Sequence, residues 1–190
     1  MRTNGYGRLQ VVAGPMFSGK SEELLRRVRR ARLAGLEVVL VNHAWDERYG
    51  TGEVSSHTGL SLGSTSATDV PGLLAAVGDR APDLLAVDEA QFFGPDVVPA
   101  LEAVLRRGTT VVVAGLSVTF DGRPFEPLPT LMAIAEDVTR LTAVCGVCGA
   151  DAVFHQRIRA GSGGDPLDGT AAHVGGTETY AARCRRHHEP

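Results

Sequence analysis

Residues 14–21 read Gly14-Pro15-Met16-Phe17-Ser18-Gly19-Lys20-Ser21, which is the pattern G-x-x-x-x-G-K-S of a phosphate-binding loop. The pattern predicts that backbone N–H groups cradle a phosphate chain and that the Lys20 ammonium reaches its β- and γ-phosphates. Lys20 is the only lysine of the chain, so a compact, flexible ammonium is reserved for this position while arginine serves elsewhere. The hydroxyl of Ser21 is predicted to be a ligand of Mg²⁺.

The residues on both sides of this loop have the patterns of a strand and a helix. Leu9–Ala13 is an apolar run of strand length, and residues 22–33 are rich in helix formers with apolar side chains on one face. Residues 43–69 are polar and glycine-rich, and we expect an active-site loop there. Further strands are predicted at 37–42, 84–87, 109–114 and 138–144, and further helices at 70–77, 95–107 and 128–136. This alternation predicts an α/β fold of the P-loop NTPase type, a mostly parallel sheet with helices on both faces.

Two carboxylates follow the predicted strand at residues 84–87. Asp88 ends an apolar run, which is the Walker-B arrangement, and it is predicted to hold Mg²⁺ beside Ser21, directly or through water. Glu89 is a candidate general base, which could orient either a water molecule or a substrate hydroxyl. The alternative for Glu89 is a solvated turn residue.

Composition narrows the class of protein. A chain of 190 residues with a net charge of −3 fits one core domain with at most a small appendage, and it argues against bulk nucleic-acid binding. The arginine-rich run 26–32 is interpreted as a solvated helix face or a subunit contact in preference to a nucleic-acid surface. The sequence has no long apolar span and no N-terminal signal pattern, so we expect a soluble, cytoplasmic protein without a membrane partner.

The character of the chain changes at Cys145, where glycine, cysteine and histidine replace long apolar runs. We therefore predict a catalytic, ATP-binding domain at 1–144 and a small C-terminal zinc-binding domain at 145–190. The pairs Cys145/Cys148 and Cys184/His187 each have two intervening residues, which suits a closed, structural Cys₃His zinc site. Two alternatives stay open, namely His188 as the fourth ligand and three free cysteines beside an unrelated histidine.

The box Asp88-Glu89-Ala90-Gln91-Phe92-Phe93, together with the Pro-Met-Phe filling of the phosphate loop and the Cys-x-x-Cys pair, resembles the zinc-containing (type II) thymidine kinase family. The resemblance runs from about Gly7 to His187. It includes the segments Asp46-Glu47-Arg48-Tyr49, Pro124-Phe125, Leu141-Thr142-Ala143-Val144-Cys145 and Gly175-Gly176 with Tyr180. It implies ATP-dependent phosphorylation of the thymidine 5′-hydroxyl to dTMP, inhibition by dTTP and a homotetramer.

The resemblance also implies roles for single residues of the phosphate site. Glu89 is expected to accept the proton of the thymidine 5′-hydroxyl, and Asp88 is expected to serve Mg²⁺. Arg48 is expected to stabilise charge on the transferred phosphoryl group beside Lys20. Ala90 and Gln91 are assigned to the nucleotide site with them.

The thymine pocket of such kinases is apolar, with the base recognised by the backbone of a loop. By position the pocket residues are Met16, Phe92, Leu116, Phe120 and Phe125, with Tyr180 closing the site. Core packing is an equally good interpretation for the phenylalanines. The loop residues are Ala171, Ala172, His173, Val174 and Gly175.

Two positions depart from the family pattern. His155 stands where many relatives carry a threonine that touches the base, and it either contacts the pyrimidine or points to solvent. Ser117 follows Leu116 where the family usually has aspartate, which puts fine substrate selectivity in doubt. Two other classes of protein compete with a nucleoside kinase: a nucleic-acid-dependent ATPase with a zinc ribbon, and a non-catalytic zinc-binding module.

Overall fold

A six-stranded parallel sheet forms the body of the protein. The computed structural model describes residues 5–44, 53–55, 61–158 and 179–189. The strand order is β5-β2-β6-β7-β1-β8, and every neighbouring pair is parallel. The strands are β1 (Leu9–Gly14), β2 (Val38–His43), β5 (Thr65–Ala67), β6 (Leu84–Asp88), β7 (Thr110–Leu116) and β8 (Asp137–Arg140).

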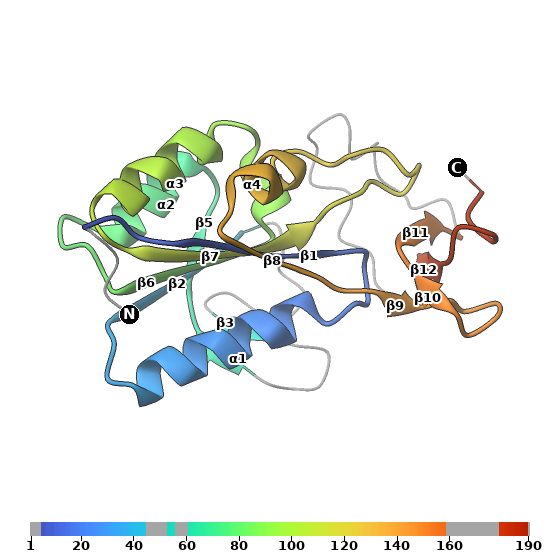
Figure 1. Cartoon of the computed structure of the whole chain (residues 1–190), viewed down its shortest axis with the longest axis horizontal. Coiled ribbons are helices and arrows are strands. Elements are labelled where there is room, and N and C mark those ends of the chain that lie inside the picture. Colours follow the sequence, from blue (N-terminus) through green and yellow to red (C-terminus); the bar gives the residue numbers. More distant parts are fainter. Residues whose placement is uncertain (1–4, 45–52, 56–60, 159–178, 190) are drawn as a thin grey trace.

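Helices cover both faces of this sheet, as predicted (Figure 1). One face carries α1 (Lys20–Leu33), and the other carries α2 (Val70–Val77), α3 (Val97–Arg106) and α4 (Leu128–Ile134). Side chains of β1 alternate between the faces, because Val11 packs in the core under α2, α3 and α4 while Val12 packs under α1. A strand buried on both faces reads as a continuous apolar run. Runs of this kind explain why β1, β6 and β7 could be located from the sequence.

Helix α1 is held to the sheet by an apolar face and by one arginine. Its buried residues are Leu24, Leu25, Val28 and Ala31, which recur at helical spacing. Arg27 is half-buried, and its guanidinium donates to Gln10, Asp137 and Thr139 as well as to Glu23. Arg27 therefore fastens α1 to β1 and β8, a role that the interpretation of the arginine run as a solvated face missed.

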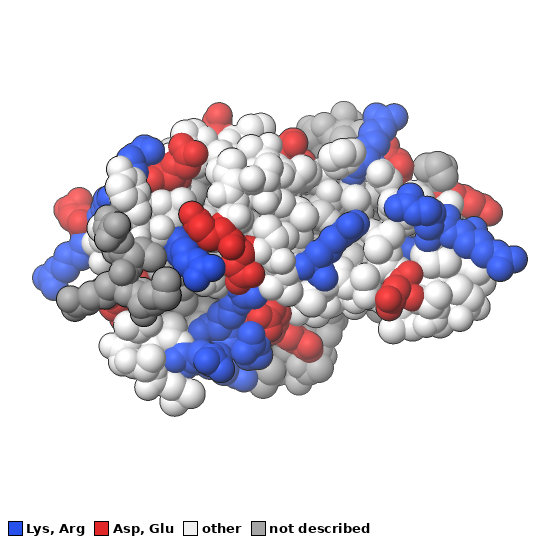
Figure 2. Space-filling view, viewed as in Figure 1, with Lys and Arg blue, Asp and Glu red and all other residues white. Residues whose placement is uncertain are grey.

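The remaining charges on α1 are mixed in sign. Arg26 is exposed and forms an ion pair with Glu23 at 2.6 Å. Figure 2 shows acidic side chains among the basic ones over α1 in this view. The exposure of Arg26 agrees with a solvated helix face or a subunit contact.

The structure differs from the predicted elements at two places. Residues 43–69 are not all loop, since β5 forms an edge of the sheet and β3 (Glu53–Ser55) pairs with β4 (Ser61–Gly63). The single strand predicted at 138–144 is two strands, because β8 pairs with β1 and the chain then leaves the sheet to form β9 (Ala143–Val144).

A small C-terminal unit lies beyond the end of the sheet at which β1 and β7 finish (Figure 1). It consists of two antiparallel pairs, β9 with β10 (Asp151–Ala152) and β11 (Phe154–Arg157) with β12 (Tyr180–Arg183). Among the described residues, its hydrophobic cluster consists of alanine and cysteine side chains, and Tyr180 and His155 are also buried in the unit. Within the described ranges, no helix is long and apolar enough to span a membrane.

Candidate active site and metal centre

The phosphate-binding loop occupies the predicted place between β1 and α1. Gly14 ends β1 and cannot be larger, because an added Cβ would lie 2.6 Å from Ser18 Oγ and 2.7 Å from the Leu141 carbonyl oxygen. Ser18 Oγ and Lys20 Nζ both donate hydrogen bonds to the Pro15 carbonyl, at 2.9 and 2.8 Å. The lysine ammonium therefore lies over its own loop at the N-terminus of α1, where the helix dipole favours an anion.

The two carboxylates lie at the end of β6. Asp88 is only 3% exposed, and one of its oxygens accepts from the Glu89 backbone N–H at 3.0 Å. Glu89 has a left-handed backbone with φ 51°, which is uncommon for a residue with a side chain. Gln91 lies in the short 3₁₀ helix Ala90–Phe93 and is buried. Its amide donates to the Glu89 carboxylate and accepts from the Leu116 N–H at 3.0 Å, so it holds that carboxylate against the end of β7.

The parallel sheet brings the loop and the carboxylates to one edge. Strand β7 lies between β1 and β6, with Leu116 in register with Gly14. Because parallel strands end at the same edge, the loop after Gly14 and the residues after Val87 face the same side of the molecule. Gln91 connects the two groups, since its hydrogen bonds join Glu89 to β7, the strand that neighbours the phosphate loop.

Several predicted pocket residues lie around Arg157 of β11. Its guanidinium carbon lies 4.9 Å from the ring centroid of Phe120 and 5.9 Å from that of Tyr180. These two rings come from the loop after β7 and from β12, so the structure brings together aromatic residues distant in sequence. Tyr180 is buried, whereas Phe120 is half-buried.

The other predicted pocket residues follow the same edge. Phe92 follows β6, and its ring centroid lies 5.6 Å from that of His43 at the end of β2. Phe125 N–H donates to the Ser117 carbonyl at 3.1 Å, which folds the segment after Leu116 back on itself. The half-buried pocket residues are Met16, Phe92, Leu116 and Phe125.

His155 is buried, with 3% of its surface exposed, so the alternative that it points to solvent is wrong. Its ring meets the Tyr180 ring edge-on with centroids 5.8 Å apart, and its Nδ1 has no hydrogen-bond partner among the described residues. Burial, followed by the positive charge of Lys20 and then that of His188, lowers the pKa of His155 to about 3. The imidazole is therefore neutral near pH 7.

Six of the predicted site residues lie outside the described ranges. They are Arg48, Ala171, Ala172, His173, Val174 and Gly175.

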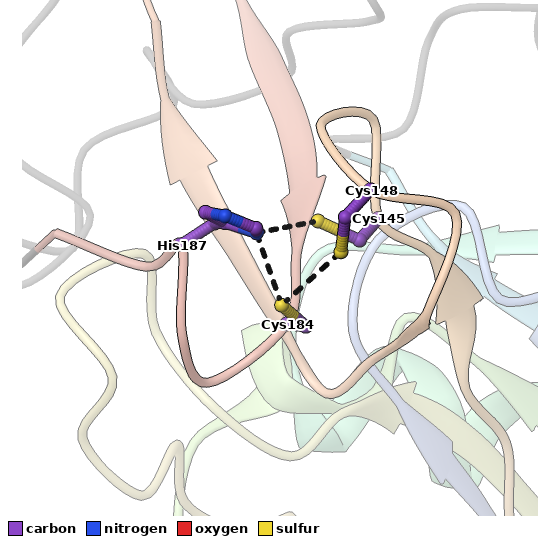
Figure 3. Close-up of side chains that lie close together, drawn as sticks. All are labelled: Cys145, Cys148, Cys184 and His187. Atoms are coloured by element: carbon purple, nitrogen blue, oxygen red, sulfur yellow. Dashed lines mark hydrogen bonds between the residues drawn. The ribbon is translucent and has the colours of Figure 1, made fainter.

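The predicted metal ligands converge in the C-terminal unit (Figure 3). The ligand atoms of Cys145, Cys148, Cys184 and His187 all lie within 4.8 Å of one another. The Cys148 and Cys184 sulfurs are 3.8 Å apart, and His187 Nδ1 lies 3.4 Å from Cys184 Sγ and 3.8 Å from Cys145 Sγ. The alternative of an unrelated histidine is therefore wrong.

These distances match the edges of a zinc tetrahedron. With Zn–S of about 2.3 Å and Zn–N of about 2.0–2.1 Å, such a tetrahedron has edges of about 3.8 Å between sulfurs and about 3.6 Å between sulfur and nitrogen. Hydrogen bonding from the backbone of Cys184, and next from that of Val147, lowers the pKa of Cys145 to about 5, which favours the thiolate that metals bind. The four residues thus fit a closed zinc site.

The rival ligand His188 is engaged elsewhere. Its ring stacks on Phe154 with centroids 4.5 Å apart, and its Nε2 lies 2.9 Å from the Phe120 carbonyl oxygen. His188 thereby ties the C-terminal segment to the loop that carries Phe120. The geometry favours His187 over His188 as the fourth ligand.

Comparison with known proteins identifies the family. The profile described as Thymidine kinase matches residues 7–188. The chain belongs to the thymidine kinase family. Thymidine kinases of Deinococcus deserti and Halobacterium salinarum are each 42% identical to it, over 96% of this chain and 94% of theirs. The thymidine kinase of Coprothermobacter proteolyticus is 44% identical over 96% of this chain and 91% of its own.

Similarity to a solved structure outside the family is weak. The replication initiator DnaA bound to AMPPCP and single-stranded DNA has a TM-score of 0.41 and 12% identity, covering 71% of this chain and 40% of that chain. A similarity of this size supports no conclusion about function. The alternative of a nucleic-acid-dependent ATPase is not favoured, since the family match covers nearly the whole chain.

In this thymidine kinase family member, sequence reasoning missed two polar residues at the end of β2. Asn42 is in register with Asp88, and its side-chain oxygen accepts from Ser64 at 2.9 Å and from Ser66 at 3.2 Å. His43 is buried against the rings of the 3₁₀ helix, and burial lowers its pKa. Their position in the sequence could have revealed them, since both follow the apolar run of β2. That strand ends at the same sheet edge as β6 and its carboxylates.

Proposed function

We propose that this protein transfers the γ-phosphoryl group of ATP to the 5′-hydroxyl of thymidine and so forms dTMP. Membership of the thymidine kinase family supports the overall reaction. The observation that carries the proposed mechanism is the orientation of Glu89, whose carboxylate is held by Gln91 at the same sheet edge as the phosphate loop.

In the proposed reaction Glu89 acts as the general base. Its carboxylate accepts the 5′-hydroxyl proton as the 5′-oxygen bonds to the γ-phosphorus of ATP. The bond from that phosphorus to the oxygen bridging the β- and γ-phosphates breaks, and ADP leaves with the electron pair. The loop N–H groups, Lys20 and Arg48 stabilise the negative charge, so that most of the catalysis is positioning and electrostatics.

Ser21 and Asp88 are the residues that would hold Mg²⁺. The Asp88 carboxylate, which is buried, and the Ser21 hydroxyl are both hard oxygen donors, which fits this cation. When bound, Mg²⁺ neutralises charge on the phosphate oxygens of ATP. Ala90 joins these residues in the proposed nucleotide site.

The proposed thymine site is the aromatic region around Arg157. We assign to it Met16, Phe92, Leu116, Phe120, Phe125, His155 and Tyr180, together with residues 171–175. The neutral imidazole of His155 could offer a hydrogen bond to a polar substrate group in an otherwise apolar wall. A homotetramer and inhibition by dTTP complete the proposal by family resemblance. A cytoplasmic location and a division of the chain near residue 144 are proposed from the sequence pattern.

Replacing the base tests the mechanism directly. We expect Glu89→Gln to lower kcat for dTMP formation roughly 10²–10⁴-fold, because the amide keeps the shape of the side chain and cannot accept the proton. The measurement is dTMP production from ATP and thymidine, with Glu102→Gln on the exposed face of α3 as the matched control.

Unchanged turnover in Glu89→Gln would remove the assignment of the base. ATP hydrolysis stimulated by single-stranded DNA and not by thymidine would overturn the proposed reaction itself.

The role of Gln91 can be separated from that of the base. We expect Gln91→Met, which keeps the volume and removes both hydrogen bonds, to lower kcat roughly 10- to 100-fold because the base is then misoriented. The Kd of ADP, measured by calorimetry, should stay within about twofold of the wild-type value if Gln91 acts only through Glu89, and a larger loss would support its place in the nucleotide site. A variant with wild-type kcat would contradict the positioning role.

A further inference from the structure

Phe17, in the middle of the phosphate loop, has an unusual backbone. Its φ is 67°, and Glu89 is the only other non-glycine residue with a positive φ in the described part of the chain. Such a conformation is strained for an aromatic residue, so the surroundings of Phe17 must hold it in place.

The ring of Phe17 packs into the C-terminal unit and not into the sheet. It contacts the small apolar core formed by Ala143, Cys145, Ala152, Ala182 and Cys184. The described members of this core, apart from Phe17, are no larger than cysteine, so the phosphate loop supplies its largest apolar side chain. Two members of this core, Cys145 and Cys184, belong to the metal centre.

The first residue of the loop contacts the same part of the chain. Leu141 N–H donates to the Ala13 carbonyl at 2.8 Å, and the Leu141 carbonyl oxygen lies 2.7 Å from where a Cβ of Gly14 would be. The segment that leads from β8 to Cys145 therefore runs along the start of the phosphate loop. The loop is held at Gly14 by this segment and at Phe17 by the core behind it.

We propose that Phe17 is a positioning residue that fixes the phosphate loop against the zinc centre, so that zinc binding and nucleotide binding strengthen each other. This inference rests on the proposed function, because it requires ATP and ADP to bind at the loop. Filling the four-ligand site orders the core that receives the Phe17 ring, and the anchored loop keeps its N–H groups directed at phosphate. Because coupling between two binding events is reciprocal, nucleotide must also retain zinc.

The test uses ADP as the probe and the full chain throughout. Calorimetry gives the Kd of ADP for zinc-loaded protein and for protein depleted with a chelator. We expect depletion to weaken ADP binding by wild type about 10-fold, within the range usual for coupled sites. Phe17→Ala should weaken ADP binding by a similar factor even with zinc bound, and depletion should then change it little. Phe17→Leu should retain most of the wild-type affinity and most of the zinc dependence.

Two controls separate the ring from other effects. Phe17→Gly adopts a positive φ without strain, so it removes the ring while easing the backbone. Val104→Ala truncates a buried side chain of α3 remote from the loop, and it should lower stability while leaving the ADP Kd and its zinc dependence unchanged. A second measurement avoids depleted protein altogether: ADP should slow the removal of zinc by a coloured chelator severalfold in wild type and not in Phe17→Ala.

The outcomes are distinguishable. Wild-type affinity in Phe17→Gly would overturn the inference, as would ADP binding and zinc release that are independent of each other in the wild type. If zinc-loaded wild type fails to bind ADP at all, the proposed function fails and the inference fails with it. Loss of coupling in Phe17→Ala and Phe17→Gly, with rescue in Phe17→Leu, supports it.

Discussion

The sheet and the C-terminal unit are stabilised in different ways. The sheet buries valine and leucine side chains on both faces, in two clusters under opposite layers of helices. The described part of the C-terminal unit has a small cluster of alanine and cysteine side chains, against which Phe17 of the phosphate loop packs, and it also buries Tyr180 and His155. Burial of large apolar side chains stabilises the first region, whereas the second has a much smaller apolar cluster, so we expect it to depend on metal ligation. A change that lowers the folding stability of one region should therefore leave the folding stability of the other largely unchanged.

Removing the metal should give the largest effect on stability, and the loss of stability should be confined to the C-terminal unit. Structural zinc contributes on the order of 10 kcal/mol to the folding of small metal-dependent units. We expect His187→Ala to lose bound zinc and to expose the amides of β9 to β12 to rapid hydrogen exchange, while the sheet amides stay protected. Elemental analysis for zinc and exchange mass spectrometry measure the two effects.

His188→Ala is the matched control, because it changes the neighbouring residue of the same type. It should keep its zinc and lose only the contacts with Phe154 and Phe120. Zinc loss in His188→Ala with retention in His187→Ala would reverse the ligand assignment.

Truncation of a side chain in the sheet core should destabilise the sheet and leave the metal centre intact. Leu25 of α1 is fully buried against the sheet, and Leu25→Ala should lower the free energy of unfolding by about 2–5 kcal/mol through lost burial and a cavity. Denaturant unfolding measures this loss. The zinc content of the folded variant should equal that of the wild type, and a reduced content would show that the two regions are less separate than their cores suggest.

Acid should produce the smallest effect, through Glu23 on α1. Hydrogen bonding from Arg26, followed by that from Arg27, lowers the pKa of Glu23 from 4.5 to about 2. A carboxyl with a depressed pKa in the folded state contributes stability that is fully present above pH 4.5 and is lost as the pH falls towards 2. We expect Glu23→Gln to flatten the dependence of unfolding free energy on pH in this window, with a smaller difference at high salt. Identical pH profiles for variant and wild type would contradict this role of Glu23.

The sequence allowed the main elements and the metal ligands to be predicted, because each has a local pattern. The apolar run of β1, the motif after it and the carboxylates after β6 are all read from neighbouring residues. The ligand pairs Cys145/Cys148 and Cys184/His187 are two such local patterns, and tetrahedral chemistry joins them.

What could not be predicted depends on contacts between residues far apart in the chain. Nothing in Thr65–Ala67 distinguishes an edge strand from a loop, since a three-residue strand has too few side chains to show alternation. The insertion of β7 between β1 and β6 is set by packing and not by any single segment. The same is true of the burial of Arg27 and His155, whose partners lie on other strands.

Glu89 shows how the fold accepts a local penalty for its proposed chemistry. Its left-handed backbone is one that glycine adopts without strain and glutamate does not. A glycine at this position would relieve the strain and give a protein with no base to take the proton. Selection for stability alone would therefore remove the carboxylate, and with Glu89 as the proposed base its retention is a trade of stability for catalysis.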